Sequence, residues 1–96
     1  MRRSEICETA ARLIGGERAE KHGDAAVNFG AIAELWSGYF RAKGYDHDLV
    51  DRVDVGRLLA LMKIARSLYG SYNPDDYVDA VGYLALTGEF DAGAEQ

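Results

Sequence analysis

The stretch from Asp54 to Leu86 constrains the fold most strongly, because it contains two amphipathic helical patterns separated by a turn. In the first pattern apolar residues recur every three or four positions around about half of the helix circumference, which predicts a helix over residues 54–69. Gly70 ends that helix. Asn73 and Pro74 mark the start of the next one, since Asn caps free N–H groups and Pro has no N–H to leave unsatisfied. We therefore expect a helical hairpin at the centre of the fold.

Four charged residues of this hairpin are expected to meet. Asp75 and Asp79 are four residues apart, so they share one edge of the second helix, where Lys63 and Arg66 face them. Arg66 projects from within the apolar sector, where a charge needs a partner, and we predict that it pairs with Asp79. Two interpretations stay open. The four charges form either a structural ion-pair network or a site in which the carboxylates hold a divalent metal and the cations hold phosphate.

The rest of the chain predicts two more helices. The first covers residues 4–14, and the second runs over residues 25–43, with Asp24 as its N-cap and Gly44 at its end. Within the second helix, Asn28 lies at the margin of the apolar face, where its amide needs a hydrogen-bond partner.

No alternating strand pattern is present, and the segment after residue 87 loses its helical periodicity. We expect an all-α bundle of about four helices. It forms a single domain over residues 1–96, with a core in residues 4–87 and a frayed tail over residues 88–96.

The composition narrows the classes of function. A net charge of −5 argues against nucleic-acid binding driven by phosphate contacts. Cys7 is the one cysteine, which excludes an internal disulfide and is typical of a reducing compartment. No apolar run follows the two N-terminal arginines or reaches about 18 residues, so neither a signal peptide nor a membrane span is expected. These features predict a cytoplasmic protein.

Two surface features suggest partners. Acidic residues cluster over residues 46–54, either as a solvated helix entrance that complements the helix dipole or as a surface that binds a host protein. A small four-helix core also cannot hide all the large aromatic residues, so we expect a homo-oligomer. The aromatic residues concerned are Trp36, Tyr39, Phe40, Tyr69, Tyr72 and Tyr77.

Short motifs also follow one another in a characteristic order: Arg18, His22-Gly23-Asp24, Asn28-Phe29, Leu35-Trp36, Leu61 to Arg66, and Asp75 and Asp79 before Gly82-Tyr83. Together they resemble a family of small domains of unknown function, mostly encoded by phages and prophages, over nearly all of residues 4–87. They are more distantly similar to the MazG-like all-α nucleotide pyrophosphohydrolases.

The MazG-like resemblance implies an oligomeric domain that binds a nucleoside triphosphate with magnesium and cleaves it between the α- and β-phosphates. By this resemblance Asp75 and Asp79 would hold magnesium, with Asp79 also catalytic. The residues that would bind phosphate or base are Arg18, His22, Asn28, Lys63 and Arg66. The first acidic motif of such enzymes, ExxE, is not recognisable in the expected helix. A phage protein that binds a nucleotide without cleaving it, or that binds a host protein, therefore stays open.

Overall fold

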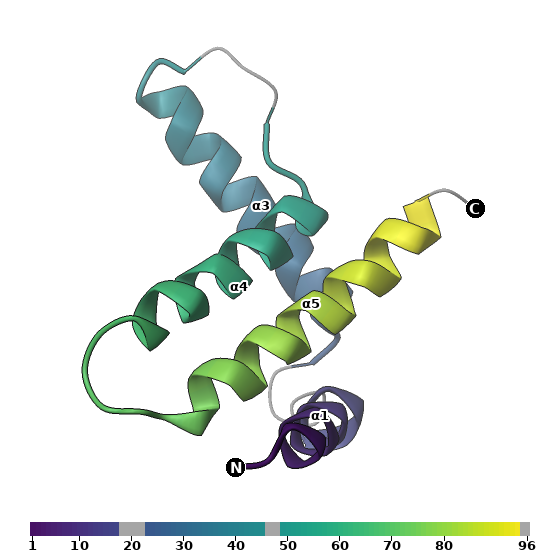
Figure 1. The fold of residues 1–96 in the computed structure, drawn as a ribbon. Helices are drawn as coiled ribbons and strands as arrows, with labels where there is room; N and C mark the ends of the chain where they lie inside the picture. Colours follow the sequence, from purple (N-terminus) through teal and green to yellow (C-terminus); the bar gives the residue numbers. More distant parts are fainter. Residues whose placement is uncertain (18–22, 46–48, 95–96) are drawn as a thin grey trace.

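The computed structural model describes residues 1–17, 23–45 and 49–94, which contain α-helices, one π-helical segment and no strand (Figure 1). This confirms the predicted all-α fold of about four helices. The elements in chain order are α1 (Arg3–Arg12), η1 (Leu13–Glu17), α3 (Ala25–Ala42), α4 (Arg52–Ser67) and α5 (Pro74–Ala94).

The helix ends follow local signals in the sequence. The Asp24 carboxylate accepts hydrogen bonds from the N–H groups of Ala26 and Val27, at 2.8 and 3.2 Å, as an N-cap should. The Asn73 side chain accepts one from the N–H of Asp75 at 3.0 Å, next to Pro74 at the start of α5. Gly70 has a φ of 76°, a left-handed conformation that suits glycine after a helix. The predicted starts of α3 and α5 are confirmed.

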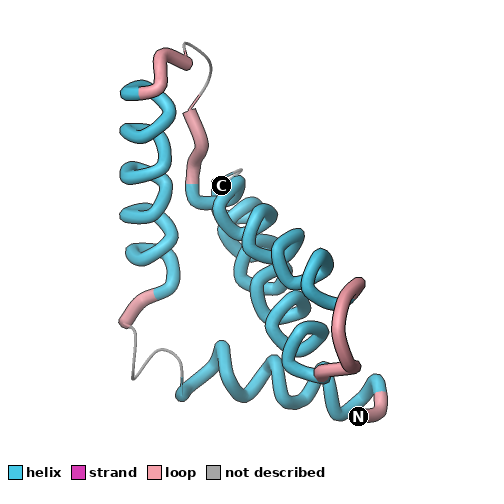
Figure 2. The backbone as a smooth tube through the Cα atoms, turned by 90° about the vertical axis from the view of Figure 1, so that its left-hand side faces the viewer, coloured by secondary structure: helices cyan, strands magenta, loops and turns pink. Residues whose placement is uncertain are grey.

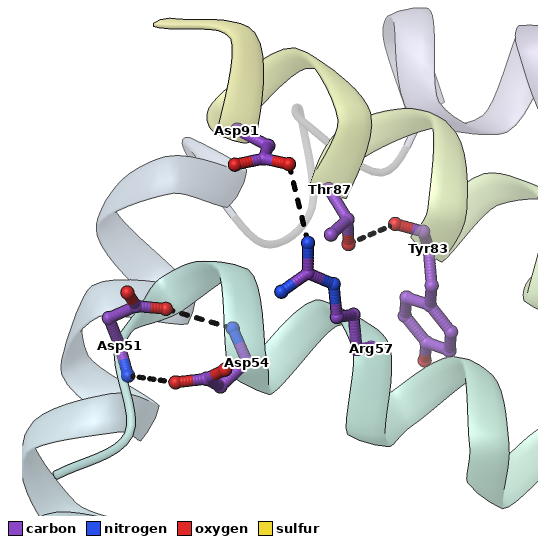
Figure 3. A network of polar contacts seen from close by, with 6 residues as sticks. All are labelled: Asp51, Asp54, Arg57, Tyr83, Thr87 and Asp91. Carbon is purple, nitrogen blue, oxygen red and sulfur yellow. Dashed lines mark hydrogen bonds and ion pairs between the residues drawn. The ribbon is translucent and has the colours of Figure 1, made fainter. Parts of the chain in front are cut away.

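Helix α4 begins at Arg52, earlier than the predicted Asp54. The Asp51 carboxylate accepts a hydrogen bond from the N–H of Asp54, and the Asp54 carboxylate accepts one from the N–H of Asp51, as Figure 3 shows. This reciprocal capping box satisfies two backbone donors of the first turn. Asp51 and Asp54 of the acidic segment therefore cap the start of α4. Residues 46–48 of the same segment lie outside the described part of the chain.

Helices α4 and α5 form the expected antiparallel hairpin (Figure 1). They approach each other closely at Gly56, where a Cβ atom would overlap Oγ1 of Thr87. The Thr87 hydroxyl is held in place because it donates a hydrogen bond to the carbonyl of Tyr83 at 2.6 Å (Figure 3). Beyond this crossing, Arg57 Nη2 lies 3.3 Å from Asp91 Oδ2 and links the two helices at the surface.

The other helices cover different parts of the hairpin, as the second view shows (Figure 2). Helix α1 and η1 pack against α5, with Ile14 beside Gly82. Helix α3 crosses α4, and the buried Ser37 hydroxyl donates to the carbonyl of Val50 at 3.2 Å. The core lies where α3, α4 and α5 meet, around Phe29, Val55 and Phe90.

The end of the chain differs from the prediction. Helix α5 continues to Ala94, so a frayed tail from residue 88 is wrong for residues 88–94. The reason is Phe90, which is buried and packs edge-on against Phe29, with ring centroids 5.6 Å apart. This contact stabilises a segment whose glycines and acidic residues give little local sign of a buried helix.

The apolar face of α4 is also less buried than its width predicts. Val55 and Ala60 are buried, but Leu61 and Leu68 are exposed. In the N-terminal half of α4, Val55 belongs to the core cluster that includes Phe29 of α3, and Leu59 packs against this cluster. The C-terminal half of α4 therefore keeps much of its apolar surface uncovered.

Among the described helices, none is both long and apolar enough to cross a bilayer.

Candidate functional site

Lys63 and Asp79 form an ion pair between α4 and α5, with 2.8 Å between Lys63 Nζ and Asp79 Oδ2. Their side chains are only 11% and 18% exposed. Asp79 also lines a cavity of about 10 Å³ between α5 and the end of α1, too small for any ligand beyond one water. The prediction that Lys63 faces Asp79 is confirmed, and the packing around the pair favours a structural role.

Arg66 does not join this pair. It is exposed and forms no ion pair with any residue in the described segments, so the predicted Arg66–Asp79 pair is wrong. Arg66 lies seven residues after Leu59, on nearly the same side of α4. Leu59 packs against the core cluster, whereas Arg66 lies two turns further along α4 and is exposed, so the guanidinium faces solvent without cost.

In the described part of the chain, Asp75 and Asp79 are not joined by further metal-ligating side chains. Asp75 is exposed in the first turn of α5, and Asp79 already holds the ammonium of Lys63. Across residues 1–17, 23–45 and 49–94, no group of three or more His, Cys, Asp or Glu side chains converges. Magnesium prefers several oxygen ligands in near-octahedral geometry. Magnesium binding therefore stays a prediction without support from these side chains.

A cleft of about 790 Å³ lies elsewhere, between the N-terminal end of α3 and the C-terminal half of α5. Asn28, one of the predicted binding residues, lines it and is partly buried. Lys63, Arg66, Asp75 and Asp79 do not line it. The structure thus separates Asn28 from the charged residues of the hairpin. Arg18 and His22, also predicted to bind ligand, lie outside the described residues.

The floor of the cleft is apolar and its edges are polar. Phe29, Tyr83 and Phe90 lie together in it, with the Phe29 and Tyr83 rings 6.3 Å apart between centroids. Arg52, at the start of α4, also lines the cleft and places its guanidinium carbon 5.2 Å from the centre of the Phe90 ring. This distance is typical of a cation–π interaction, which favours one position of the exposed guanidinium over the ring.

Carboxylates of two helices complete the lining. Asp24 caps α3 and Glu89 belongs to α5, and both line the cleft with Arg52. Sequence reasoning missed Arg52, because a cation in the first turn of a helix has no local signal for function. It missed Glu89 because residues after 87 were expected to be irregular.

The chain belongs to the family described as a domain of unknown function, DUF6378, which matches residues 5–91. It is similar to the "Gene 55 protein" of Mycobacterium phage L5, at 38% identity over 81 residues. It is also similar to the "Gene 55 protein" of Mycobacterium phage D29, at 41% identity over 78 residues.

These alignments cover 84% and 81% of this chain, and 49% and 48% of the two phage proteins. The chain thus spans about half the length of the curated relatives it matches. No solved structure matches. The predicted resemblance to small phage-encoded domains of unknown function is confirmed, while the MazG-like similarity stays a prediction.

Proposed function

We propose that this domain binds a nucleotide in the cleft between α3 and α5. The observation that carries the proposal is the aromatic floor of the cleft with a guanidinium, an amide and two carboxylates around it. The volume of about 790 Å³ lies within the range of small-molecule sites, which are typically about 300–1,000 Å³ and combine an apolar lining with a few polar groups.

Each part of a nucleotide has a matching group in this cleft. The base would lie against the aromatic lining, where Tyr83 is the least buried of the three rings, because every base has a π-face that can stack. The Arg52 guanidinium is suited to a phosphate, since it presents a rigid set of donors. Asp24 and Glu89 accept hydrogen bonds from ribose hydroxyls or exocyclic amino groups, and the Asn28 amide can donate or accept.

Binding is supported better than hydrolysis. The cleavage that the MazG-like resemblance implies depends on Asp79, which is paired with Lys63 and does not line the cleft. Hydrolysis stays a prediction with its own measurement, the magnesium-dependent release of pyrophosphate. Binding of a host protein through the acidic segment also stays a prediction. Its described members, Asp51 and Asp54, are engaged in the capping box.

The test is the thermal unfolding of the chain with nucleoside mono- and triphosphates, each with and without magnesium. A ligand at a hundred times its Kd stabilises the folded state by about 2.7 kcal/mol, which raises the Tm of a domain of this size by roughly 10–20 °C. We expect Arg52→Ala to remove most of this shift. Arg66→Ala is the matched control, because Arg66 is an exposed arginine outside the cleft.

A second variant tests the contribution of the Asn28 side-chain amide. Asn28→Ala should weaken nucleotide binding and leave the helical circular dichroism unchanged. The proposal is refuted if no nucleotide shifts the melting curve of the wild type. It is also refuted if Arg66→Ala weakens binding as much as Arg52→Ala does, since the hairpin surface would then be the phosphate site.

A further inference from the structure

The outer face of the α4–α5 hairpin carries apolar side chains on the side away from α3. On α4, Leu61, Ile64 and Leu68 lie about 140–180° around the helix from Leu59, which packs beside the core. On α5, the equivalent side chains lie about 140–180° around the helix from Leu86, another residue beside the core. These α5 residues are Tyr77, Val81 and Leu84.

Contacts between the helices place these six residues in register. In an antiparallel helix pair, the numbers of two facing residues add up to a nearly constant value. The contacts Lys63–Asp79 and Gly56–Thr87 give this value for α4 and α5. By this register Leu61 lies level with Leu84, Ile64 with Val81, and Leu68 with Tyr77. We call these three rows the hairpin face. All six side chains are 36–72% exposed.

The hairpin face contains no charged residue. The Arg57–Asp91 ion pair lies beyond the Leu61–Leu84 row and marks one end of the face. The exposed side of α3 carries fewer large apolar side chains: Leu35 and Tyr39 lie close together there, and the exposed charges of Glu34 and Arg41 lie about 100–160° around the helix from them. A contiguous apolar face without charges is typical of a surface that is buried in an assembly.

The solvent-accessible surface area of one copy indicates how much surface an assembly could bury. The accessible area is 6850 Å², whereas a folded monomer of 10.5 kDa is expected to expose about 5,400 Å². The radius of gyration is 14.6 Å against an expected value of about 12.5 Å. The excess area of about 1,400 Å² exceeds the roughly 800 Å² that each partner buries in a standard interface.

We propose that the hairpin face packs against the same face of a second copy of this chain, in a two-fold symmetric dimer whose core contains two α4–α5 hairpins. A two-fold interface uses one patch on both subunits, so it needs a face that is complementary to itself. Rows of Leu, Ile, Val and Tyr without a charge meet that requirement. Apolar side chains pack favourably against one another, and the face carries no charge that would repel the same face of a second copy.

The test is sedimentation velocity of the complete chain at about 100 µM, a concentration at which dimers with micromolar Kd are populated. We expect the wild type to sediment as two copies of the 10.5 kDa chain. Ile64→Glu and Leu84→Glu should each give a monomer with unchanged helical circular dichroism, because both side chains are already exposed in one copy. Leu35→Glu, on α3 and 74% exposed, should leave the dimer intact.

The proposal is overturned if the wild type is a monomer at this concentration, or if both hairpin-face variants stay dimeric. A dimer that is lost in Leu35→Glu but kept in Leu84→Glu would place the interface on α3 instead and would overturn it equally.

Discussion

Replacing Gly56 by alanine tests the close approach of α4 and α5 at Thr87. A Cβ atom at residue 56 would overlap Oγ1 of Thr87 and would lie 3.0 Å from its Cβ and 3.3 Å from its Cγ2. All three side-chain heavy atoms of Thr87 crowd the new methyl group. Rotation of the threonine would therefore exchange one close contact for another, and the hydrogen bond from its hydroxyl to Tyr83 would be lost. The helices must separate to make room.

Two opposing terms decide the size of the effect. Alanine in place of an interior helical glycine stabilises by about 1 kcal/mol through helix propensity. Forcing an extra methyl group into a packed contact costs about 1–3 kcal/mol and occasionally more. Because α4 and α5 form the centre of the fold, we expect the upper part of this range and a net destabilisation on the order of 1–2 kcal/mol. That corresponds to a fall in Tm of about 4–16 °C.

Urea unfolding followed by circular dichroism measures this difference. Gly38→Ala is the matched control, because it is also an interior helical glycine and its Cβ would meet nothing within 4 Å, so it should stabilise the domain. Thr87→Ala removes Oγ1 and Cγ2, and the double variant should recover most of the loss. If Gly56→Ala is as stable as Gly38→Ala, or if its effect is simply additive with that of Thr87→Ala, the helices do not approach each other as described.

Two further predictions concern the hairpin and the end of the chain. Asp79→Asn should destabilise by about 1–3 kcal/mol in urea unfolding, because it leaves the mostly buried ammonium of Lys63 without its charge partner. Asp75→Asn, at an exposed position, should stay within about 0.5 kcal/mol of the wild type, and equal effects would contradict the structural role of the pair. Phe90→Ala should cost about 3–5 kcal/mol by the same measurement, as expected for a buried aromatic residue. A negligible loss would mean that the end of α5 is frayed after all.

The starts of α3 and α5 were predictable because their signals are local. Asp24 and Asn73 accept hydrogen bonds from N–H groups two or three residues away, so the residues that determine these ends are neighbours in the sequence. That Lys63 faces Asp79 was predictable for a related reason, although Asp79 was expected to pair with Arg66. A short turn makes the two helices antiparallel, which leaves few possible registers.

The candidate site was only partly predictable. Asn28 attracted attention because an amide at the edge of an apolar face needs a partner, and it lines the cleft. Arg52 and Glu89 gave no such sign, since charged residues at these positions are ordinary in any helix. They share the cleft only because α3 crosses the hairpin near the start of α4 and the end of α5.

The sequence by itself determined the helices, their caps and the hairpin, because each depends on interactions within a turn or two of the chain. Only the tertiary structure decided which sides of those helices are covered. Arg66 faces solvent because α3 does not reach the end of α4, and residues 88–94 are helical because Phe90 packs against Phe29. In both cases the deciding partner lies far away in sequence, where periodicity carries no information about which helix, if any, lies opposite.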